Sequence, residues 1–242
     1  MITNAAAGTR VDEIREGLYR ISTPMALPNG GGFTMNQFLI VDDEPLLWHT
    51  GPRLMFDFTR EAIAAVMPVE RLRHIGFSHV EADECGALNQ FLAMAPNAAP
   101  LCGQVAAMVS VGDMADRPPR ALADGDELSL GRRTVRWLDT PHLPHNWESG
   151  YLFETSTRTL LCGDILTQPG GDHPPLTSGD IIGPSEGMRA AMRYFAPNAE
   201  TPGQFDKLIA TDPLVLACMH GASWEGDAAA LLTRYKTILC PA

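Results

Sequence analysis

Apolar and polar residues alternate along the chain with two different periods, and the period changes from one segment to the next. Short apolar runs predict strands at 17–22, at 37–51 with a turn at 42–45, and at 73–80. Apolar residues at helical spacing predict helices at 58–68 and 84–96, each ending at a proline. Strands that alternate with helices in this way are typical of an α/β fold.

The middle of the chain predicts β-hairpins, at 126–141 and 149–166, and the last part returns to helices. A Gly- and Pro-rich loop is predicted at 167–187, a length typical of functional lids or disordered segments. Beyond it the pattern predicts helices at 187–197, 203–213 and 227–239 and a strand at 214–221. Since no repeat or clear linker interrupts the pattern, a single domain over 1–242 is favoured.

Composition narrows the class of partner. The chain has 242 residues, of which 45% are hydrophobic and 19% charged, and this suits a globular protein that buries a core without disulfides. The formal net charge of -11 argues against nucleic acid or an anionic membrane as a partner, because both are bound by basic patches. Five scattered cysteines, the lack of a signal-peptide pattern and the lack of a membrane-length apolar run predict a soluble cytoplasmic protein.

The stretch HVEADECG at 79–86 gathers metal-binding side chains directly after a predicted strand. His79, Glu81 and Asp83 occupy alternate positions, and in a tight turn leading into a helix they could converge on one point. Imidazole and carboxylate groups are ligands for iron, zinc or manganese. For this stretch alone, the alternative is a polar loop that caps a helix.

Further side chains of the same kinds follow later predicted strands. His142 and His145 lie in TPHLPHNWES, Asp164 follows the strand in LLCGDIL, and His220 follows the strand in LVLACMHG. The C-terminal ends of strands are where α/β folds build their sites. Together with 79–86, these residues favour a metal site.

With these residues in this order, the sequence resembles the metallo-β-lactamase superfamily, most of all the β-lactamase-like domain of the flavodiiron proteins and their oxygen-binding diiron relatives. The family pattern is HxExDH, then a His in a segment like TPxLHWPDS, an Asp after a strand, and a final His in HG. The segment RYFAPN at 193–198 is similar to the family's Tyr-Tyr-Ala-Asn stretch. The resemblance covers about 11–242 and implies an αββα sandwich, with two β-sheets flanked by helices.

The resemblance also implies a ligand set for two metal ions. By it, the first ion takes His79, Glu81 and His145; the second takes Asp83, residue 84 and His220; and Asp164 bridges them. Glutamate at position 81, where zinc hydrolases of the superfamily have histidine, marks the diiron branch. Two iron ions are therefore expected, with manganese or zinc as alternatives, and no flavin within this chain.

The sequence departs from the family pattern at two positions. Glu84 stands where the family has histidine, and His49 in LLWHTG stands where the superfamily often has aspartate. With Glu84 counted, the set has three imidazoles and four carboxylates, which suits iron or manganese. The alternative is that Glu84 turns outward as an acidic residue at a helix N-terminus.

Four other residues receive smaller roles. Tyr194, on a predicted helix, is either a core residue or a hydroxyl near bound oxygen. His142 is an extra ligand, a gate or a residue behind the ligands. Both are kept as candidate catalytic residues. His49 is expected to be a core histidine with its hydrogen bonds satisfied, and Cys85 is assigned no chemistry.

The expected function is that of a non-haem diiron protein that binds or reduces dioxygen, or nitric oxide as another diatomic ligand. Reduction would require an external electron-transfer protein, because 1–242 contains no flavodoxin-like segment, whereas oxygen sensing would not. The alternatives are a dinuclear metal hydrolase and a binding module with an empty site. A homodimer is left open.

Overall fold

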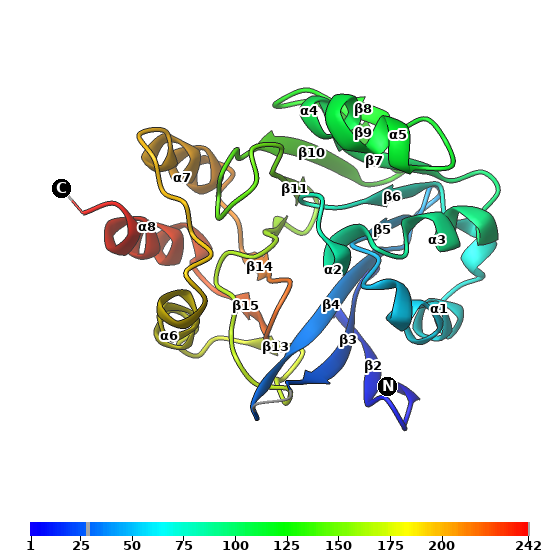
Figure 1. Cartoon of the computed structure of the whole chain (residues 1–242), viewed down its shortest axis with the longest axis horizontal. Helices are drawn as coiled ribbons and strands as arrows, with labels where there is room; N and C mark the ends of the chain where they lie inside the picture. The colour runs from blue at the N-terminus through cyan, green and yellow to red at the C-terminus, as the bar shows by residue number, and fades with distance from the viewer. Residues whose placement is uncertain (28–29, 242) are drawn as a thin grey trace.

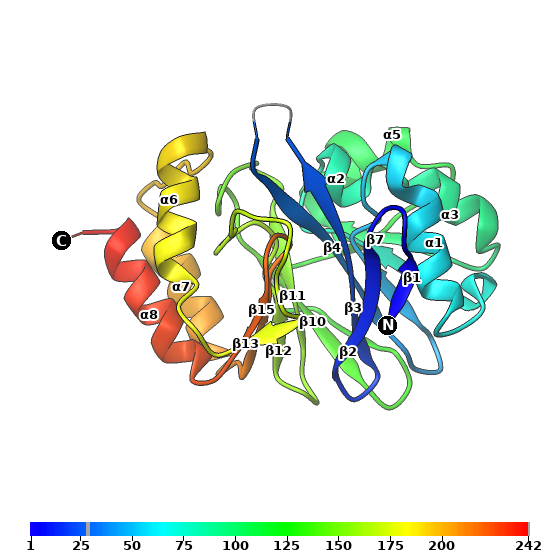
Figure 2. The same cartoon turned by 90° about the horizontal axis from the view of Figure 1, so that it is seen from below.

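Two β-sheets pack face to face, and helices cover the outer face of each sheet (Figures 1 and 2). This computed structural model describes residues 1–27 and 30–241. The order of layers is helix, sheet, sheet, helix, as Figure 2 shows most directly. The predicted αββα sandwich is therefore confirmed, while the prediction of a single domain over 1–242 stays a prediction.

The first sheet has eight strands that are neighbours in the order of the chain. The pairs from β1 to β5 are antiparallel, and the pairs from β5 to β8 are parallel. The strands are β1 (Ile2–Asn4), β2 (Thr9–Arg15), β3 (Leu18–Ala26), β4 (Gly32–Ile40), β5 (Leu46–Trp48), β6 (His74–Gly76), β7 (Ala99–Gly103) and β8 (Arg120–Leu122).

The second sheet has seven strands in the order β13-β15-β14-β12-β11-β10-β9. Its β12–β14 and β13–β15 pairs are parallel, and its other pairs are antiparallel. The strands are β9 (Glu127–Ser129), β10 (Thr134–Asp139), β11 (Gly150–Glu154), β12 (Thr159–Leu161), β13 (Leu176–Thr177), β14 (Val215–Ala217) and β15 (Ser223–Glu225).

The helices fall into two sets that cover opposite faces of the sandwich (Figure 2). The set on the first sheet comprises α1 (Phe56–Ala64), α2 (Ala82–Cys85), α3 (Leu88–Met94), α4 (Gln104–Ala106) and α5 (Gly112–Met114), with a π-helical turn at Ala107–Val111 and 3-10 turns at Arg53–Met55 and Val69–Arg71. The set on the second sheet comprises α6 (Ile182–Met192), α7 (Thr201–Ala210) and α8 (Ala228–Leu239). Among the described helices, none has the length and apolar character needed to cross a bilayer.

Both faces of each sheet are buried, and neighbouring residues of one strand therefore enter different cores. On β4, Phe38 packs between the sheets while Leu39 packs under the helices; on β11, Leu152 and Phe153 divide in the same way. This follows from the period of two along a strand. The layer between the sheets is filled by large side chains such as Trp48 and Trp137, whose ring centroids lie 6.2 Å apart.

The structure corrects the prediction for 167–187 and for the helix after it. That segment contains β13 and the start of α6, so it is not a continuous loop. Gly183 and Pro184 lie in the first helical turn, where a missing N–H costs nothing, and the Asp180 carboxylate accepts the N–H of Gly183. The helix ends at Met192, and Arg193 adopts a left-handed backbone conformation with φ 54°, so Tyr194 lies beyond the helix.

We predict that Gly150→Ala destabilises the chain by about 1–3 kcal/mol, the usual cost of overpacking a core. A Cβ at this position would overlap the buried indole ring of Trp137. The free energy of unfolding in urea measures the effect. Gly203→Ala is the control: this glycine lies in α7 with no atom within 4 Å of the new Cβ, so alanine there should stabilise by up to ~1 kcal/mol. Equal urea midpoints for the two variants would contradict the close packing of Gly150 against Trp137.

Candidate metal centre

The candidate ligands follow strands of both sheets and meet at one edge of the sandwich. His79 and Glu81 come three and five residues after β6 ends at Gly76, and the short helix α2 then carries Asp83 and Glu84. His145 lies between β10 and β11, and Asp164 and His220 each follow the parallel pair β12–β14 by three residues. The two sheets are joined at this edge, because the N–H of Gly150 donates to the carbonyl of Ser78 over 2.8 Å.

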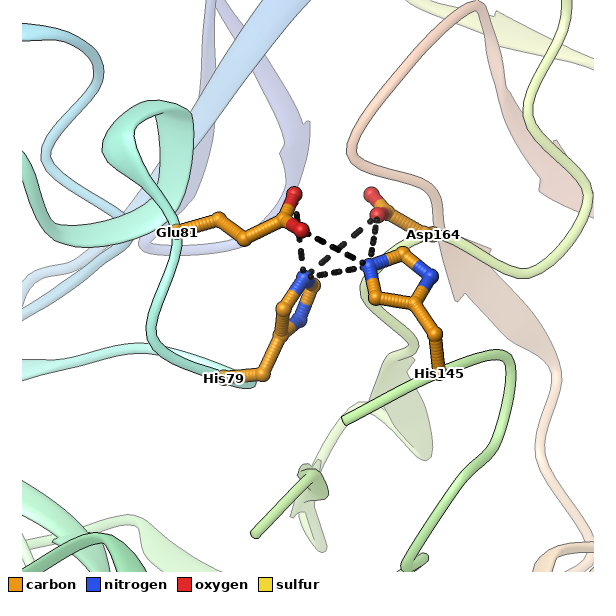
Figure 3. A group of neighbouring side chains, drawn as sticks. All are labelled: His79, Glu81, His145 and Asp164. Carbon is orange, nitrogen blue, oxygen red and sulfur yellow. Dashed lines mark hydrogen bonds and ion pairs between the residues drawn. The ribbon is translucent and has the colours of Figure 1, made fainter. Parts of the chain in front are cut away.

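His79, Glu81, His145 and Asp164 form the first ligand group (Figure 3). The Nε2 atoms of His79 and His145 lie 3.0 Å apart. Both point toward the same carboxylates: His79 Nε2 lies 3.6 Å from Glu81 Oε2, and His145 Nε2 lies 3.3 Å from Glu81 Oε1. Asp164 Oδ2 lies 3.6 Å from each of the two imidazole nitrogens. Four ligand-type atoms from three separate segments therefore surround one point.

Asp83, Glu84 and His220 form the second ligand group. His220 Nε2 lies 3.4 Å from Asp83 Oδ2 and 3.5 Å from Asp164 Oδ1. Asp164 thus turns one oxygen to each group, in the arrangement of a bridging carboxylate. Glu84 also adjoins both groups, since its Oε2 lies 3.8 Å from His79 Nε2.

The spacing and the unmet hydrogen bonds of these residues fit metal ions. Ligand atoms bound at ~2.1 Å lie roughly 3.0 Å apart in an octahedral shell and about 3.4 Å apart in a tetrahedral one. The separations of 3.0–3.6 Å around the first group match these values. Several buried atoms have no hydrogen-bond partner among the described residues: both oxygens of Glu84 and Oδ1 of Asp164. Buried carboxylate oxygens without donors are costly unless a cation or proton is bound.

Hydrogen bonds at Nδ1 hold two of the imidazole rings with Nε2 facing inward. His220 Nδ1 donates to the carbonyl of Thr34 over 2.8 Å, and this carbonyl belongs to β4. His79 Nδ1 lies 2.9 Å from the hydroxyl of Ser78. A histidine that donates through Nδ1 offers the Nε2 lone pair to a metal, and such partners orient ligands in metalloproteins.

The charges of the site are strongly coupled. Burial lowers the pKa of His220, but the Asp164 and Asp83 carboxylates that face its Nε2 atom outweigh it and raise the pKa to about 10. The neighbouring His145 and His79 imidazoles lower the pKa of Glu81 to about 2. Without a metal, imidazolium protons therefore balance part of the carboxylate charge. Metal ions bring the same positive charge and leave the imidazoles as neutral donors.

Glu84 is fully buried, so the alternative in which it turns outward at the helix N-terminus is wrong. Burial raises its pKa well above the usual range, and the neighbouring Asp164 and Asp83 carboxylates raise it further. An acid in this position cannot ionise cheaply without a cation nearby. Its side chain lies where the second ligand group needs a third donor.

A cavity of about 430 Å³ opens directly onto the ligand groups. Carboxylates and imidazoles of both groups form its floor, and Phe33, Met188, Met192 and Tyr194 form apolar walls. Two of these walls, Met188 and Met192, come from α6, in the segment 187–197 that the sequence predicted as a helix. The sequence pattern gave no signal for Phe33 or for the two methionines as cavity residues.

The remaining candidates are distributed between the site and the surface. Tyr194 lies in the cavity wall, and its hydroxyl donates to the carbonyl of Asp164 over 3.4 Å. His142 is exposed and lies outside both ligand groups and the cavity wall, so a direct role for it finds no support. Cys85 is buried and burial raises its pKa to about 12, which keeps the thiol protonated. His49, expected to be an ordinary core histidine, lies behind His79 and contacts Ser78.

Comparison with known proteins finds one matching family and several related proteins. A family model described as ODP family beta lactamase matches residues 33–221. The chain is 26% identical over 219 residues to an anaerobic nitric oxide reductase flavorubredoxin of Pectobacterium carotovorum, a match that covers 84% of this chain and 42% of that protein. It is 29% identical over 192 residues to a rubredoxin-oxygen oxidoreductase of Megalodesulfovibrio gigas, covering 76% and 45%. The chain therefore spans less than half the length of these relatives.

The fold is also that of a solved flavodiiron core. The metal-soaked Flv1 flavodiiron core from Synechocystis superposes with a TM-score of 0.81 at 18% identity, over 96% of this chain and 60% of that one. At this identity the likeness concerns the fold. It agrees with the two helix-covered sheets described above and with the predicted resemblance to the superfamily.

We predict that Glu84→Gln stabilises the metal-free chain, and increasingly so as the pH rises above 4.5, the ordinary pKa of a glutamate. A raised pKa in the folded state means that the folded chain holds a proton that the unfolded chain releases, so stability falls as pH rises through this range. Glutamine cannot ionise and escapes this loss. Urea unfolding of chelator-treated protein between about pH 5 and pH 8 measures the difference in unfolding free energy between Glu84→Gln and the parent chain.

Glu148→Gln is the matched control. This buried carboxylate accepts the N–H of Val80 over 3.1 Å, so an amide there gains nothing. The free energy of unfolding of Glu84→Gln and of the parent chain could instead change with pH in the same way. That result would contradict the burial of an ionisable Glu84.

Proposed function

Because the chain belongs to the ODP family beta lactamases, we propose that it is a non-haem diiron protein that binds and reduces dioxygen or nitric oxide. The observation that carries this proposal is the pair of ligand groups that share Asp164, whose two oxygens face opposite groups. A shared carboxylate suits two ions that act together on one small molecule.

Each ligand group would hold one ion. His79, Glu81 and His145 would bind the first, and Asp83, Glu84 and His220 the second. Asp164 would bind both. The unmet hydrogen bonds of Glu84 and Asp164 support this assignment, because a metal would satisfy the oxygens that no protein donor reaches.

Iron suits this donor set better than zinc. Four of the seven donors are carboxylates and none is a thiolate, and such sets favour iron or manganese over metals that prefer sulfur. When bound, iron supplies one-electron exchange with a diatomic molecule. Glu81 takes part as an oxygen donor where a zinc hydrolase of this superfamily has an imidazole.

The protein's own residues would control what reaches the ions. Phe33, Met188 and Met192 make the walls of the cavity apolar, which favours small uncharged molecules over ions. Burial raises the pKa of Tyr194, so its hydroxyl keeps its proton and can donate a hydrogen bond toward the cavity. Its present partner is the carbonyl of Asp164, which ties it to the bridging residue.

Electrons would come from a separate redox protein or domain. The names of the relatives pair oxygen or nitric oxide reduction with rubredoxin and flavorubredoxin, and a donor of that kind is the partner we propose. An oxygen sensor would use the same ligand groups without turnover. Catalytic consumption of oxygen in the presence of reduced rubredoxin distinguishes the reductase from the sensor.

Metal analysis is the first experiment. Protein purified without chelator should contain about two iron ions per chain, as the two ligand groups imply. It should also consume dioxygen or nitric oxide when reduced rubredoxin is added. Two zinc ions with rapid hydrolysis of a generic ester would favour the dinuclear hydrolase instead. A chain that retains no metal after mild purification would favour a binding module.

We predict that Asp164→Asn lowers the affinity for both ions, whereas His145→Ala lowers it mainly for the first. Asp164 faces both groups, and His145 faces only one. Loss of a direct ligand should exceed the ~10–100-fold typical of residues behind the ligands. Competition with a chromogenic chelator measures both constants. An Asp164→Asn chain with two tightly bound ions would show that this carboxylate does not bridge.

We predict that Glu84→His raises the reduction potential of the second iron. A carboxylate carries negative charge and stabilises ferric iron, and a neutral imidazole does so less. A redox titration followed by electron paramagnetic resonance measures the potential. An unchanged potential with full occupancy would mean that Glu84 does not bind that ion in either oxidation state.

A further inference from the structure

A chain of hydrogen bonds runs from the first ligand group back into the core. His79 Nδ1 lies 2.9 Å from the hydroxyl of Ser78, and this hydroxyl lies 3.1 Å from Nε2 of His49. All three side chains are buried, with exposed fractions of 0% or 1%. We call these three residues the relay. Its far end, His49, is one of the two positions at which the sequence departs from the family pattern.

His49 is held rigidly in this place. It directly follows β5, its N–H donates to the carbonyl of Gly76 over 2.8 Å, and its backbone is left-handed with φ 64°. Its Nδ1 has no hydrogen-bond partner among the described residues, so the contact with Ser78 is the one described hydrogen bond of its ring. A left-handed conformation is strained for a histidine and persists where the surroundings fix it.

We propose that His49 is a positioning residue that acts through Ser78 to hold the His79 ring with its Nε2 atom toward the metal. This rests on the proposed function, because it assumes that His79 is a ligand. The aspartate that the superfamily often has at this position could only accept a hydrogen bond when ionised, and would add another buried negative charge. A neutral imidazole accepts the same hydrogen bond without that charge.

The relay has one consistent direction when His79 binds a metal. Nε2 then carries no proton, so Nδ1 carries it and donates to Ser78. The Ser78 hydroxyl then donates a hydrogen bond to Nε2 of His49, which leaves only His49 Nδ1 unpaired. If His49 Nε2 instead carried the proton and donated it to the Ser78 oxygen, both the Ser78 hydroxyl proton and His49 Nδ1 would be unpaired. Since unmade buried hydrogen bonds are costly, the first arrangement prevails. Burial lowers the pKa of His49 to about 3 and so keeps it neutral, as an acceptor must be.

The test compares two replacements of similar shape at His49. His49→Gln keeps a hydrogen-bond acceptor for Ser78, and His49→Met removes it, while the backbone strain is the same in both. Ser78→Ala cuts the relay at its middle. Co²⁺ serves as the probe, because its visible spectrum reports the geometry of its ligands. His74→Met controls for loss of a buried histidine, since His74 contacts Glu44 and not the site.

We expect His49→Met and Ser78→Ala each to lower the Co²⁺ affinity of the first ligand group by about 10–100-fold and to change its spectrum. The His49→Met/Ser78→Ala double variant should lose no more than either single variant, because both cut the same relay. His49→Gln and His74→Met should stay within a few-fold of the parent chain. Equal losses in His49→Gln and His49→Met, additive losses in the double variant, or full affinity in His49→Met would overturn the proposal.

A metal-free measurement separates this proposal from the proposed function. Nitrogen NMR of the histidine rings in chelator-treated protein reports where each ring proton lies. The His79 Nδ1 resonance should shift in both His49→Met and Ser78→Ala but stay near its parent position in His49→Gln. A parent chain that binds no Co²⁺ would contradict the proposed function, and the NMR shifts would still decide whether the relay exists. Should His49→Met fail to fold, Ser78→Ala and His49→Gln decide it by the same criteria.

Discussion

Four carboxylates converge on one buried edge of the sandwich, and the described protein groups do not provide enough donors to satisfy them. Glu84 and Asp164 keep oxygens that no described donor reaches, although they lie among the most buried acids of the chain. In the metal-free chain, protons on His145 and His220 balance part of this charge, as their raised pKa values indicate. Buried charge of one sign is tolerated only when a cation accompanies it. The need for positive charge at this point accounts for the ligand groups, the burial of Glu84 and the direction in which the imidazoles face.

The rest of the fold serves to hold these groups still. Strand β4 carries Thr34 and Asn36, which bind the segment around His220 through its carbonyls and N–H groups. The two sheets are also tied beside His79 through the Ser78–Gly150 hydrogen bond. Trp48 and Trp137 fill the space between the sheets and fix their spacing. Ligands from both sheets can therefore meet to within the few tenths of an ångström that a metal shell requires.

The ligand types and their order could be predicted from the sequence, and the sandwich followed from the family resemblance of those residues. The prediction failed where the structure depends on contacts between distant parts of the chain. Pro184 and Gly183 made 167–187 read as a loop, whereas Asp180 supports a helix start there. His142 and His145 are equivalent in sequence, and only the turn of the chain between β10 and β11 sends one toward the site and the other to the surface. The sequence marked His49 only as a departure from the aspartate of the superfamily and did not predict its contact with Ser78, which lies 29 positions away.

By itself, the sequence determined which donors are present: three histidines and four acids at the ends of predicted strands. Period-two and helical spacing determined the strands and helices that carry them, because these periods depend on local geometry. Tertiary structure alone decided which oxygen of Asp164 faces which group, that Glu84 turns inward, and that His49 stands behind His79. These outcomes depend on how two sheets pack and on which buried groups find partners. Such long-range balances of burial and charge leave no mark in the spacing of residues along the chain.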